Sequence, residues 1–254
     1  MNLKQAFDLG GKTALITGGG TGLGNAMARA LSQCGARVVI CGRREEMLKK
    51  AASELGPNAA YRVHDVTETD RANSLVESIE KEFGPLDILI NNAGQHQKKD
   101  SVAVSPGEFA DILAVHVKAG FALSQATARS MLSRHTGSII FISSMTALFG
   151  LPSVAAYSAA KSAVTGLVRA LAVEWSPSGL RVNAIAPGWI ESDMMHAVMK
   201  SDPDRERKIL NRTPLQRFGE QEDIGWAAAY LCSPAAKFVT GTCLVVDGGV
   251  SIGF

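Results

Sequence analysis

Short, continuously apolar segments alternate with longer stretches of helical period along this chain of 254 residues. The apolar segments are rich in β-branched residues and are not interrupted by polar ones, as expected when helices cover both faces of a parallel sheet. The predicted strands are residues 12–17, 37–41, 60–64, 88–91, 138–143, 181–186 and 243–247. We therefore predict the α/β class, with residues 1–254 forming a single doubly wound domain of the Rossmann type.

Two further segments bear on how such a domain would work. Ser105-Pro106-Gly107-Glu108 has the pattern of a capping box with proline at the first helical position, which predicts one long helix running to about residue 134. The least regular stretch, residues 191–216, is rich in methionine and charge. An irregular segment between two ordered elements is a candidate substrate lid.

The first predicted strand ends in a glycine-rich turn, TGGGTGLG, at residues 17–24. Glycines between a strand and a helix let the backbone approach a pyrophosphate, and the helix N-terminus then stabilises the negative charge. The spacing differs from the usual GxGxxG pattern, and glycine-rich turns also occur simply to make tight corners. The turn alone therefore leaves both interpretations open.

The end of the second predicted strand bears on which cofactor such a turn would bind. Dinucleotide folds that bind NAD place an acidic residue there, against the ribose hydroxyls. Here the position is Gly42, followed by Arg43 and Arg44. An arginine without a neighbouring carboxylate suits a 2′-phosphate, so the sequence favours NADP(H) over NAD(H). The alternative is that both arginines are solvated charges at the start of a helix.

Three side chains suggest acid–base chemistry. Tyr157 and Lys161 are four residues apart in a predicted helix, so their side chains share one face. A nearby ammonium group is expected to lower the pKa of the phenol, which would let Tyr157 exchange a proton with a substrate hydroxyl. Ser144 follows an apolar strand and could bond the reacting oxygen. A Tyr–Lys pair at this spacing is also common on plain helix surfaces.

Composition excludes several other classes of function. The net charge is +2 without a dense basic run, which gives no support for nucleic-acid binding. No apolar stretch approaches the roughly 18 residues of a membrane span, and the first residues lack the apolar core of a signal peptide. Four scattered cysteines indicate reduced thiols rather than disulfides or a metal site. We expect a cytoplasmic protein.

Taken in order, these motifs resemble the short-chain dehydrogenase/reductase family over nearly the whole chain. The matching segments are TGGGTGLG (17–24), HDVT (64–67), NNAG (91–94), YSAAK (157–161), NAIAPG (183–188) and VVDGG (245–249), with Ser144 placed 13 residues before Tyr157. The resemblance implies an NAD(P)-dependent oxidoreductase that interconverts a secondary alcohol and a ketone. It also implies a homotetramer.

The resemblance assigns roles to individual residues. Ser144, Tyr157 and Lys161 would be catalytic, and Lys161 would also bond the nicotinamide ribose. Together with the glycine turn and Arg43, the implied cofactor-binding residues are Gly18, Thr21, Gly22, Leu23, Gly24, Arg43, Asp65, Val66, Asn91, Ala93, Gly94, Tyr157, Lys161, Pro187, Gly188, Ile190 and Ser192. Asp65 could instead be an ordinary cap, and NNAG a plain turn after a strand.

One position departs from the family pattern. Where the family usually has a catalytic asparagine in the long helix, this chain has His116. Histidine can also hold a water and titrates near neutral pH, so His116 could take the place of the asparagine in a proton relay. It could also be a tolerated replacement, or mark impaired catalysis.

The substrate is expected to be a small molecule chosen by the variable segments, chiefly residues 95–101, 145–154 and the lid. Residues 95–99 are polar and basic, which suits an acidic or polyhydroxylated substrate, although a solvated loop explains the same charges. The chain resembles the sugar-acid branch of the family, which includes gluconate 5-dehydrogenases and ketodeoxygluconate dehydrogenases. The alternatives are a 3-oxoacyl thioester (acyl-carrier-protein) reductase and a catalytically impaired dinucleotide-binding sensor or scaffold.

Overall fold

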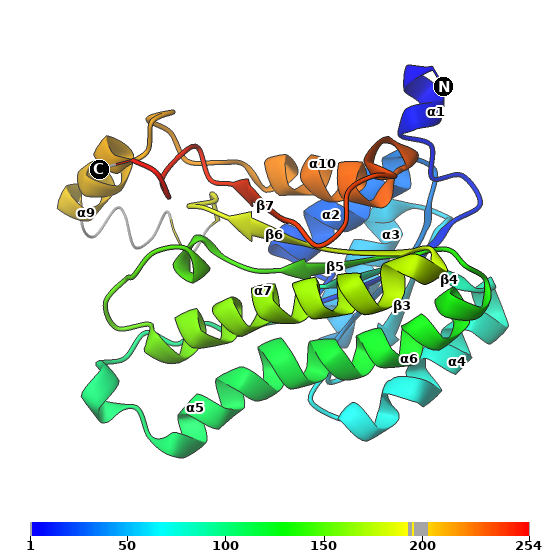
Figure 1. Cartoon of the computed structure of the whole chain (residues 1–254), viewed down its shortest axis with the longest axis horizontal. Helices are drawn as coiled ribbons and strands as arrows, with labels where there is room; N and C mark the ends of the chain where they lie inside the picture. Colours follow the sequence, from blue (N-terminus) through cyan, green and yellow to red (C-terminus); the bar gives the residue numbers. More distant parts are fainter. Residues whose placement is uncertain (1, 193–194, 196–202, 254) are drawn as a thin grey trace.

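A parallel sheet of seven strands forms the centre of the computed structural model, which describes residues 2–192, 195 and 203–253 (Figure 1). The strand order is β3-β2-β1-β4-β5-β6-β7. The strands are β1 (Thr13–Thr17), β2 (Arg37–Gly42), β3 (Ala59–Val63), β4 (Leu86–Asn91), β5 (Gly137–Ile142), β6 (Leu180–Pro187) and β7 (Cys243–Val246). The order reverses between β1 and β4, and doubly wound sheets bind their ligands at this switch point.

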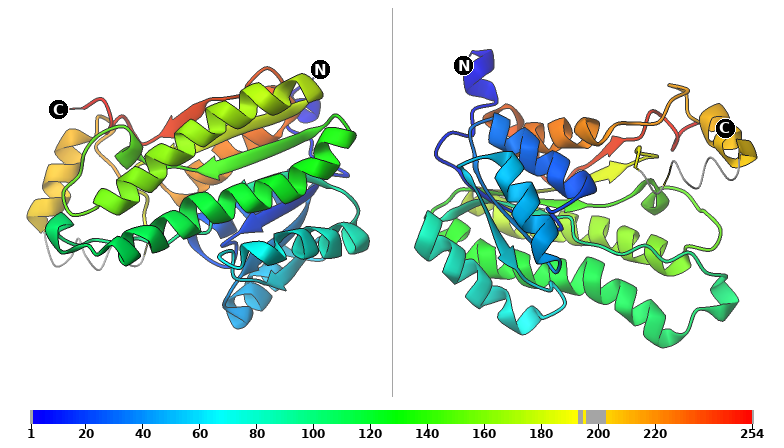
Figure 2. Two further views of the ribbon diagram at one scale, coloured as in Figure 1. Left: turned by 60° about the horizontal axis from the view of Figure 1, so that its bottom comes forward. Right: turned by 180° about the vertical axis from the view of Figure 1, so that it is seen from behind.

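Helices cover both faces of the sheet (Figures 1 and 2). One face carries α2 (Gly22–Gln33), α3 (Glu45–Leu55) and α10 (Gln221–Cys232), and the other carries α4 (Ala72–Phe83), α6 (Ala119–Ser133) and α7 (Ala155–Trp175). Further α-helices are α1 (Leu3–Ala6), α5 (Pro106–Leu113) and α9 (Pro203–Arg212), and short 3₁₀ turns lie at Thr69–Arg71, Ser101–Ala103, Met145–Ala147, Ser176–Ser178 and Pro234–Ala236. The α/β class and the doubly wound sheet predicted from the sequence are confirmed.

The two helical layers explain why the strands are apolar without interruption. In β1, Ala14 and Ile16 pack in the core that contains α2, α3 and α10, whereas Leu15 packs in the core that contains α4, α6 and α7. Successive side chains of a strand point to opposite faces, so every position of β1 is buried. The predicted strands agree with the observed ones to within two residues.

The long helix predicted from residue 105 to 134 is interrupted. Its start is as expected, because Ser105 and Glu108 form a reciprocal capping box at the N-terminus of α5. Between α5 and α6, however, Ala114–Lys118 forms one turn of π-helix with His116 at its centre. The apolar pattern does not reveal this turn, because an inserted π-turn leaves helical periodicity nearly intact on either side.

A charged cluster joins three segments at the amino edge of the sheet. Asp87 is 8% exposed, and its carboxylate accepts hydrogen bonds from the backbone N–H of Thr13 (3.1 Å), from Arg134 Nη1 (3.0 Å) and from Lys12 Nζ (3.4 Å). Arg134 also donates to the carbonyl of Leu86. The cluster therefore ties β1, β4 and the end of α6 together, at the opposite end of the strands from the candidate site.

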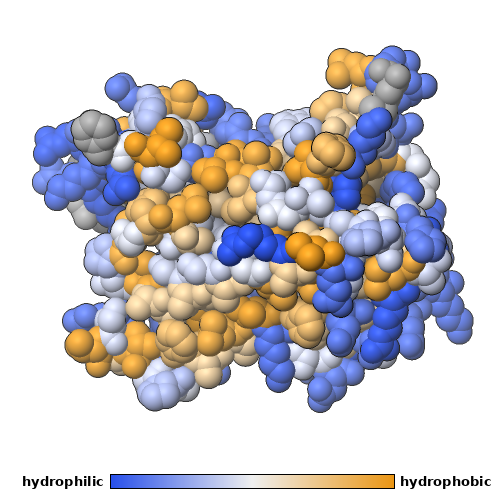
Figure 3. Space-filling model, viewed as in Figure 1, coloured by the Kyte–Doolittle hydropathy of each residue, from blue (hydrophilic) through white to orange (hydrophobic). Residues whose placement is uncertain are grey.

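The face of the molecule drawn in Figure 3 is mixed in polarity. The corner that holds α9 in Figure 1 is mainly hydrophilic, while apolar side chains gather over the outer side of the layer with α5 and α7. Phe109, Phe121 and Val173 contribute exposed apolar area to α5, α6 and α7. None of the described helices is both long enough and apolar enough to cross a membrane.

Candidate active site

The residues predicted to be functional gather where the parallel strands end. The glycine turn follows β1, Arg43 follows β2, and Asp65 follows β3. Asn91 ends β4, Ser144 lies two residues beyond β5, and Pro187 ends β6. Because the carboxyl ends of parallel strands share one edge of the sheet, residues far apart in the sequence meet in a single cleft.

The glycine turn packs tightly against the end of β4. Thr17 Oγ1 accepts hydrogen bonds from the backbone N–H groups of Asn92 and Ala93, both at 2.9 Å. Asn92 Nδ2 in turn donates to the carbonyls of Thr17 (2.9 Å) and Gly18 (3.3 Å). A Cβ on Gly24 would lie 2.3 Å from the Gly18 carbonyl oxygen, so helix α2 can approach the turn this closely only with glycine at that position.

A groove extends from the glycine turn along the edge of the sheet. Its walls come from the turn, the ends of β2 and β3, and the segment after β4. The lining residues are Gly18, Gly20, Thr21, Gly42, Arg43, Arg44, Met47, Leu48, His64, Asp65, Val66, Thr67, Asn92, Ala93, Gly94, Gln95 and Val115. Seven of the predicted cofactor-binding residues therefore line one groove: Gly18, Thr21, Arg43, Asp65, Val66, Ala93 and Gly94.

Both arginines after β2 face this groove. Arg43 Nη1 lies 3.9 Å from Asp65 Oδ2, and its side chain is mostly exposed. Arg44 Nη2 donates to Thr21 Oγ1 at 3.2 Å, which links the second strand to the first turn of α2. Asp65 Oδ1 accepts hydrogen bonds from the Thr67 N–H (2.9 Å) and hydroxyl (2.8 Å), so the carboxylate also shapes its own turn.

Tyr157, Lys161 and Ser144 meet at the end of β5. Lys161 Nζ donates to the Ile142 carbonyl at 2.7 Å and lies 5.4 Å from the centroid of the Tyr157 ring. The Ser143 hydroxyl donates to the Lys161 carbonyl at 3.2 Å, so two bonds fix α7 to the last residues of β5. The sequence prediction that these three side chains come together agrees with the observed geometry.

The pKa values differ from the sequence expectation. Burial raises the pKa of Tyr157 above its ordinary value, and a hydrogen bond with Ser144 lowers it in part. Burial also lowers the pKa of Lys161 from 10.5 to about 7. The predicted lowering of the tyrosine pKa by the lysine charge is therefore wrong for the free protein, because desolvation disfavours the charged form of both groups.

His116 is buried beside this pair. Its ring is 5.4 Å from the Tyr157 ring in a T-shaped arrangement, and Nε2 lies 2.8 Å from the Gln95 carbonyl oxygen. The Gln95 backbone nitrogen also lies 3.3 Å from Nε2, but the shorter contact with the carbonyl oxygen favours the tautomer in which Nε2–H donates. Burial, followed by the charge of Lys161, lowers the pKa of His116 to about 4, so the expectation that it titrates near neutral pH is wrong.

The His116 ring leaves no space for a side chain at Gly94. A Cβ on Gly94 would lie 2.4 Å from His116 Cε1, and all three of its nearest atoms belong to that ring. Gly94 therefore gives His116 the room to reach the backbone of Gln95. The π-turn at Ala114–Lys118 carries the ring at this point, and such turns in helices often occur at functional sites.

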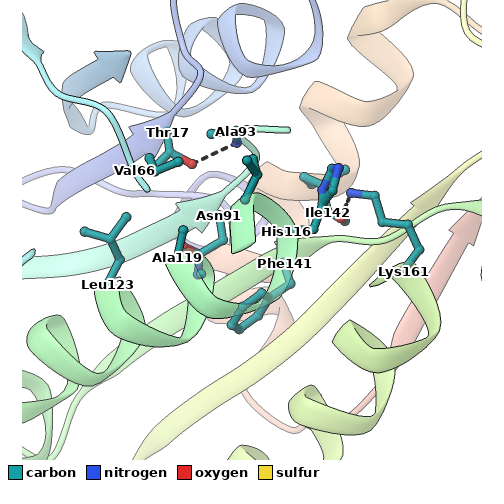
Figure 4. A pocket seen from close by; sticks show the side chains of 12 residues that line it. Thr17, Val66, Asn91, Ala93, His116, Ala119, Leu123, Phe141, Ile142 and Lys161 are labelled. Atoms are coloured by element: carbon teal, nitrogen blue, oxygen red, sulfur yellow. Dashed lines mark hydrogen bonds between the residues drawn. The ribbon is translucent and has the colours of Figure 1, made fainter. Parts of the chain in front are cut away.

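A second pocket is lined by His116 and Lys161, among other residues (Figure 4). Asn91 borders it and donates from Nδ2 to Ser124 Oγ at 2.9 Å. Asn91 Oδ1 is buried and has no hydrogen-bond partner among the described residues. Ile142 and Lys161 also line this pocket, so it extends from the end of β4 to Lys161.

The predicted nicotinamide side lies beyond β6. Gly188 N–H donates to the Val246 carbonyl at 3.0 Å, and Ile190 forms an isolated parallel bridge with Gly219. Ser192 Oγ accepts from the Met195 N–H at 3.2 Å. Several predicted cofactor-binding residues do not line the groove described above, namely Pro187, Gly188, Ile190, Ser192, Gly22, Leu23 and Gly24. Residues 193–194 and 196–202 of the predicted lid lie outside the described residues, and its described part contains α9.

Sequence reasoning overlooked Asn92 and Trp189. Asn92 stands in the NNAG motif, where its amide could have been recognised as a partner for the glycine turn. Trp189 packs with Phe218 against buried Met195 and Ile209, and the Arg205 guanidinium lies 5.8 Å from the centroid of its ring. The sequence holds no signal for this contact, because it joins the end of β6 to α9.

Known proteins resemble this chain over nearly its whole length. Residues 18–251 match the family described as enoyl-(acyl carrier protein) reductase. Gluconate 5-dehydrogenase of Gluconobacter oxydans (strain 621H) is 37% identical over 255 residues, with 99% of each chain covered. The 3-oxoacyl-[acyl-carrier-protein] reductase of Rickettsia bellii (strain RML369-C) is 37% identical over 244 residues, covering 96% of this chain and 98% of the relative.

A solved structure matches the fold over its full length. The gluconate 5-dehydrogenase from Burkholderia cenocepacia J2315, in complex with NADP and tartrate, superposes with a TM-score of 0.94 at 34% identity, covering 100% of each chain. The family is NAD(P)-dependent, and its members act on CH–OH groups and the corresponding ketones. With its Tyr–Lys pair, its glycine turn and these relatives, the chain belongs to the short-chain dehydrogenase/reductase family and is an oxidoreductase of that kind.

Proposed function

We propose that this protein interconverts a secondary hydroxyl and a ketone on a sugar acid or a related polyhydroxylated small molecule, with NADP(H) as the cofactor. The observation that carries the proposal is the meeting of Tyr157, Lys161 and Ser144 at the end of β5, where Ser144 and Tyr157 share a hydrogen bond, next to a groove that starts at the glycine turn. The relatives named above include gluconate 5-dehydrogenases, and one of them holds NADP and tartrate.

Tyr157 is the proton-transfer group in this proposal. In oxidation its phenolate takes the proton of the substrate hydroxyl, and in reduction the phenol returns a proton to the oxyanion. Ser144 bonds the reacting oxygen. Lys161, held by the Ile142 carbonyl, stabilises the phenolate whenever it carries its proton. His116 is neutral at pH 7 because its pKa is about 4, so we assign it a positioning role through the Gln95 backbone.

The described residues fit a bound dinucleotide. The close approach at Gly24 holds the N-terminus of α2 against the glycine turn, and the side chain of Thr21 at the N-cap makes no capping hydrogen bond. Such a terminus suits a pyrophosphate. Asp65 and Val66 would hold the adenine, and Asn91, Ala93 and Gly94 would form the floor. Pro187, Gly188, Ile190 and Ser192 would flank the nicotinamide, which supplies or accepts the hydride.

Arg43 supports the preference for NADP(H). It lines the groove with its guanidinium largely in solvent, beside Gly42 where NAD enzymes carry a carboxylate. We expect Arg43→Ala to weaken NADPH binding about 10- to 100-fold, as for the loss of a charge-assisted phosphate contact, with a much smaller effect on NADH. Fluorescence titration with both cofactors measures this, with Arg71→Ala as a control at an exposed arginine outside the groove. Equal losses for the two cofactors would contradict the assignment.

The remaining assignments concern the whole chain. We propose that residues 1–254 act as one catalytic domain and that the described part of residues 191–216 covers the substrate. We also propose a cytoplasmic homotetramer. The exposed apolar side chains over α5, α6 and α7 support association, and the four cysteines are free thiols.

The proposed activity is tested by following the absorbance of the reduced nicotinamide cofactor as it forms or disappears. The panel contains gluconate-type acids and polyols for oxidation, with their keto forms and an acetoacetyl thioester for reduction. Tyr157→Phe is the control, since it removes the phenolic hydroxyl that exchanges the proton and keeps the ring. Turnover of a sugar acid that disappears in Tyr157→Phe supports the proposal. Turnover of the thioester alone would instead assign the reaction of the acyl-carrier-protein reductases, and no turnover with intact NADPH binding would favour a sensor.

A further inference from the structure

Two imidazoles of unlike exposure flank the Tyr157 ring. His116 is buried and meets the ring in a T-shaped arrangement at 5.4 Å. His96, in the segment after β4, is exposed, and its ring lies 5.1 Å from that of Tyr157 with the two planes tilted by 50°. The proton-transfer group of the proposed function therefore has beside it an exposed polar side chain that the proposed reaction does not use.

The segment that carries His96 is anchored on both sides of it. Before His96, the Gln95 carbonyl oxygen lies 2.8 Å from His116 Nε2. After it, the Lys99 N–H donates to the Ser153 carbonyl at 2.8 Å, in the segment that follows β5. Because these two contacts restrict the path of the chain, the imidazole beside the tyrosine ring is part of the folded site.

The place and the charge of His96 suit an uncharged polar group of the substrate. The groove that starts at the glycine turn is lined by Gln95 but not by His96, so His96 lies beyond it, next to Tyr157. Partial burial, followed by the charge of Lys98, lowers the pKa of His96, so its imidazole is mainly neutral at and above neutral pH. A neutral imidazole donates one hydrogen bond and accepts another, which matches a hydroxyl.

We propose that His96 hydrogen-bonds a substrate hydroxyl on a carbon next to the reacting carbon, and so selects vicinal diols over isolated secondary alcohols. The proposal rests on the function proposed above and names the part of the polyhydroxylated substrate that is recognised. A substrate whose reacting oxygen is bonded by Tyr157 has its neighbouring carbons close to the phenol, within reach of an imidazole that contacts the same ring. A site that bonds a substrate hydroxyl discriminates against the analogue that lacks it, because its own polar group then loses its partner.

Kinetics with two small alcohols test this selection. Butane-2,3-diol and butan-2-ol share the reacting group and differ by one neighbouring hydroxyl. We expect the ratio of kcat/KM for the diol to that for butan-2-ol to fall about 3- to 10-fold in His96→Leu, whereas a residue that only packs on the ring would affect both alcohols equally. His96→Gln, whose amide also donates and accepts, should largely restore the ratio.

Gln97→Leu is the matched control at the next residue of the segment. It should leave the ratio within about twofold of wild type, because single substitutions away from a specific contact have small effects. An unchanged ratio in His96→Leu, or an equal fall in Gln97→Leu, would overturn the proposal. If neither alcohol is oxidised at a measurable rate, the labelling experiment below decides.

Chemical labelling of His96 separates this proposal from the proposed activity. Diethyl pyrocarbonate modifies accessible imidazoles, and mass spectrometry of the adducts gives the rates at His96 and at His135, an exposed histidine beyond α6. The protein is NADP-saturated Tyr157→Phe, which keeps the ring and does not turn gluconate over. We expect gluconate to slow the labelling of His96 severalfold and to leave that of His135 unchanged.

The outcomes distinguish the two proposals. Protection of His96 alone, without oxidation of gluconate by wild type, would keep the hydroxyl subsite and remove the proposed reaction. Oxidation of gluconate without protection of His96 would keep the reaction and overturn the subsite, as would equal protection of His135. Neither oxidation nor protection would overturn both.

Discussion

At the scale of single residues, burial controls the chemistry of the candidate site. Lys161 has a pKa of about 7, Tyr157 has a raised pKa, and His116 has a pKa of about 4. In each case desolvation is the largest cause, because a charged form loses more solvation than neighbouring charges return. A sequence shows which groups are neighbours along a helix but not how far they are buried, so the residues could be predicted and their protonation states could not.

The raised pKa of Tyr157 predicts opposite pH dependences for the two directions of reaction. Oxidation needs the phenolate, so kcat/KM for oxidation should rise about tenfold per pH unit up to the apparent pKa of the Tyr–Lys pair. Reduction needs the phenol, so its kcat/KM should be flat near neutral pH and fall above that same pKa. Rate profiles between pH 6 and 11 measure both limbs. Parallel profiles in the two directions would exclude Tyr157 as the proton-transfer group.

The depressed pKa of Lys161 predicts that this residue costs stability. Between pH 7 and 10.5 the unfolded chain binds the proton of Lys161 and the folded protein does not, so its destabilisation is complete below pH 7 and diminishes as the pH rises. Lys161→Met should abolish turnover yet raise the free energy of unfolding of the cofactor-free protein by about 1–3 kcal/mol at pH 6.

Chemical denaturation at pH 6 and pH 9 checks this expectation. The increase in the free energy of unfolding of Lys161→Met should be smaller at pH 9 than at pH 6. At both pH values the lost hydrogen bond to the Ile142 carbonyl reduces this increase. Lys49→Met, on the exposed side of α3, serves as the control and should show no such dependence on pH. A gain that increases with pH would contradict the assigned sign.

His116→Asn is expected to retain or raise activity. The imidazole is neutral at pH 7 and its visible task is the hydrogen bond to the Gln95 backbone, which an amide can also donate. His116→Leu cannot donate and should lose about tenfold or more in kcat. Steady-state kinetics of both variants distinguish the interpretations, and a collapse of turnover in His116→Asn would show that the imidazole itself is required.

At the scale of elements, the seven strands could be predicted from the sequence. The π-turn between α5 and α6 and the helix α9 could not. Apolar runs located the seven strands because each residue of a covered strand must be buried. The π-turn at Ala114–Lys118 escaped prediction because it changes hydrogen bonding and not polarity. Helix α9 escaped because its strongly polar sequence resembles a loop, and its packing against Trp189 and Phe218 became visible in the structure.

The contact between α2 and the glycine turn predicts a specific failure. In Gly24→Ala the new Cβ would lie 2.3 Å from the Gly18 carbonyl and 2.6 Å from Asn92 Nδ2, so α2 must move away from the turn. We expect NADP(H) affinity to fall about tenfold or more and stability to fall by about 1–3 kcal/mol. Gly107→Ala, in the open first turn of α5, is the control and should change neither. Cofactor titration and thermal unfolding measure the two effects, and unchanged binding would contradict this view of the turn.

At the scale of the whole molecule, the two edges of the sheet have separate tasks. The carboxyl edge gathers the polar groups of the cleft, while Asp87 at the amino edge joins Thr13, Lys12 and Arg134. The α/β fold class and the position of the site at the carboxyl edge could be predicted from the sequence, because recognisable motifs lie at the strand ends. The amino-edge cluster did not, because a single aspartate after a leucine carries no pattern that identifies three partners.

Asp87→Asn should therefore affect stability and not catalysis. It leaves Arg134 and Lys12, whose side chains are 27% and 44% exposed, without their shared carboxylate, which typically costs about 1–3 kcal/mol. The value of kcat should remain within about twofold of wild type at a temperature where the variant is folded. Denaturation curves and initial rates test the separation, and a large loss of turnover without a loss of stability would refute it.

The contact between Gly94 and His116 has an evolutionary consequence. Since a Cβ at position 94 would lie 2.4 Å from the imidazole, the two positions cannot vary independently. Alanine at 94 becomes accessible only after His116 has been replaced by a smaller side chain, so the order of the two substitutions is fixed. Once a protein of this kind has a histidine at position 116, glycine is required at position 94. A change away from this pair must therefore begin at His116 in the π-turn and not at Gly94 after β4.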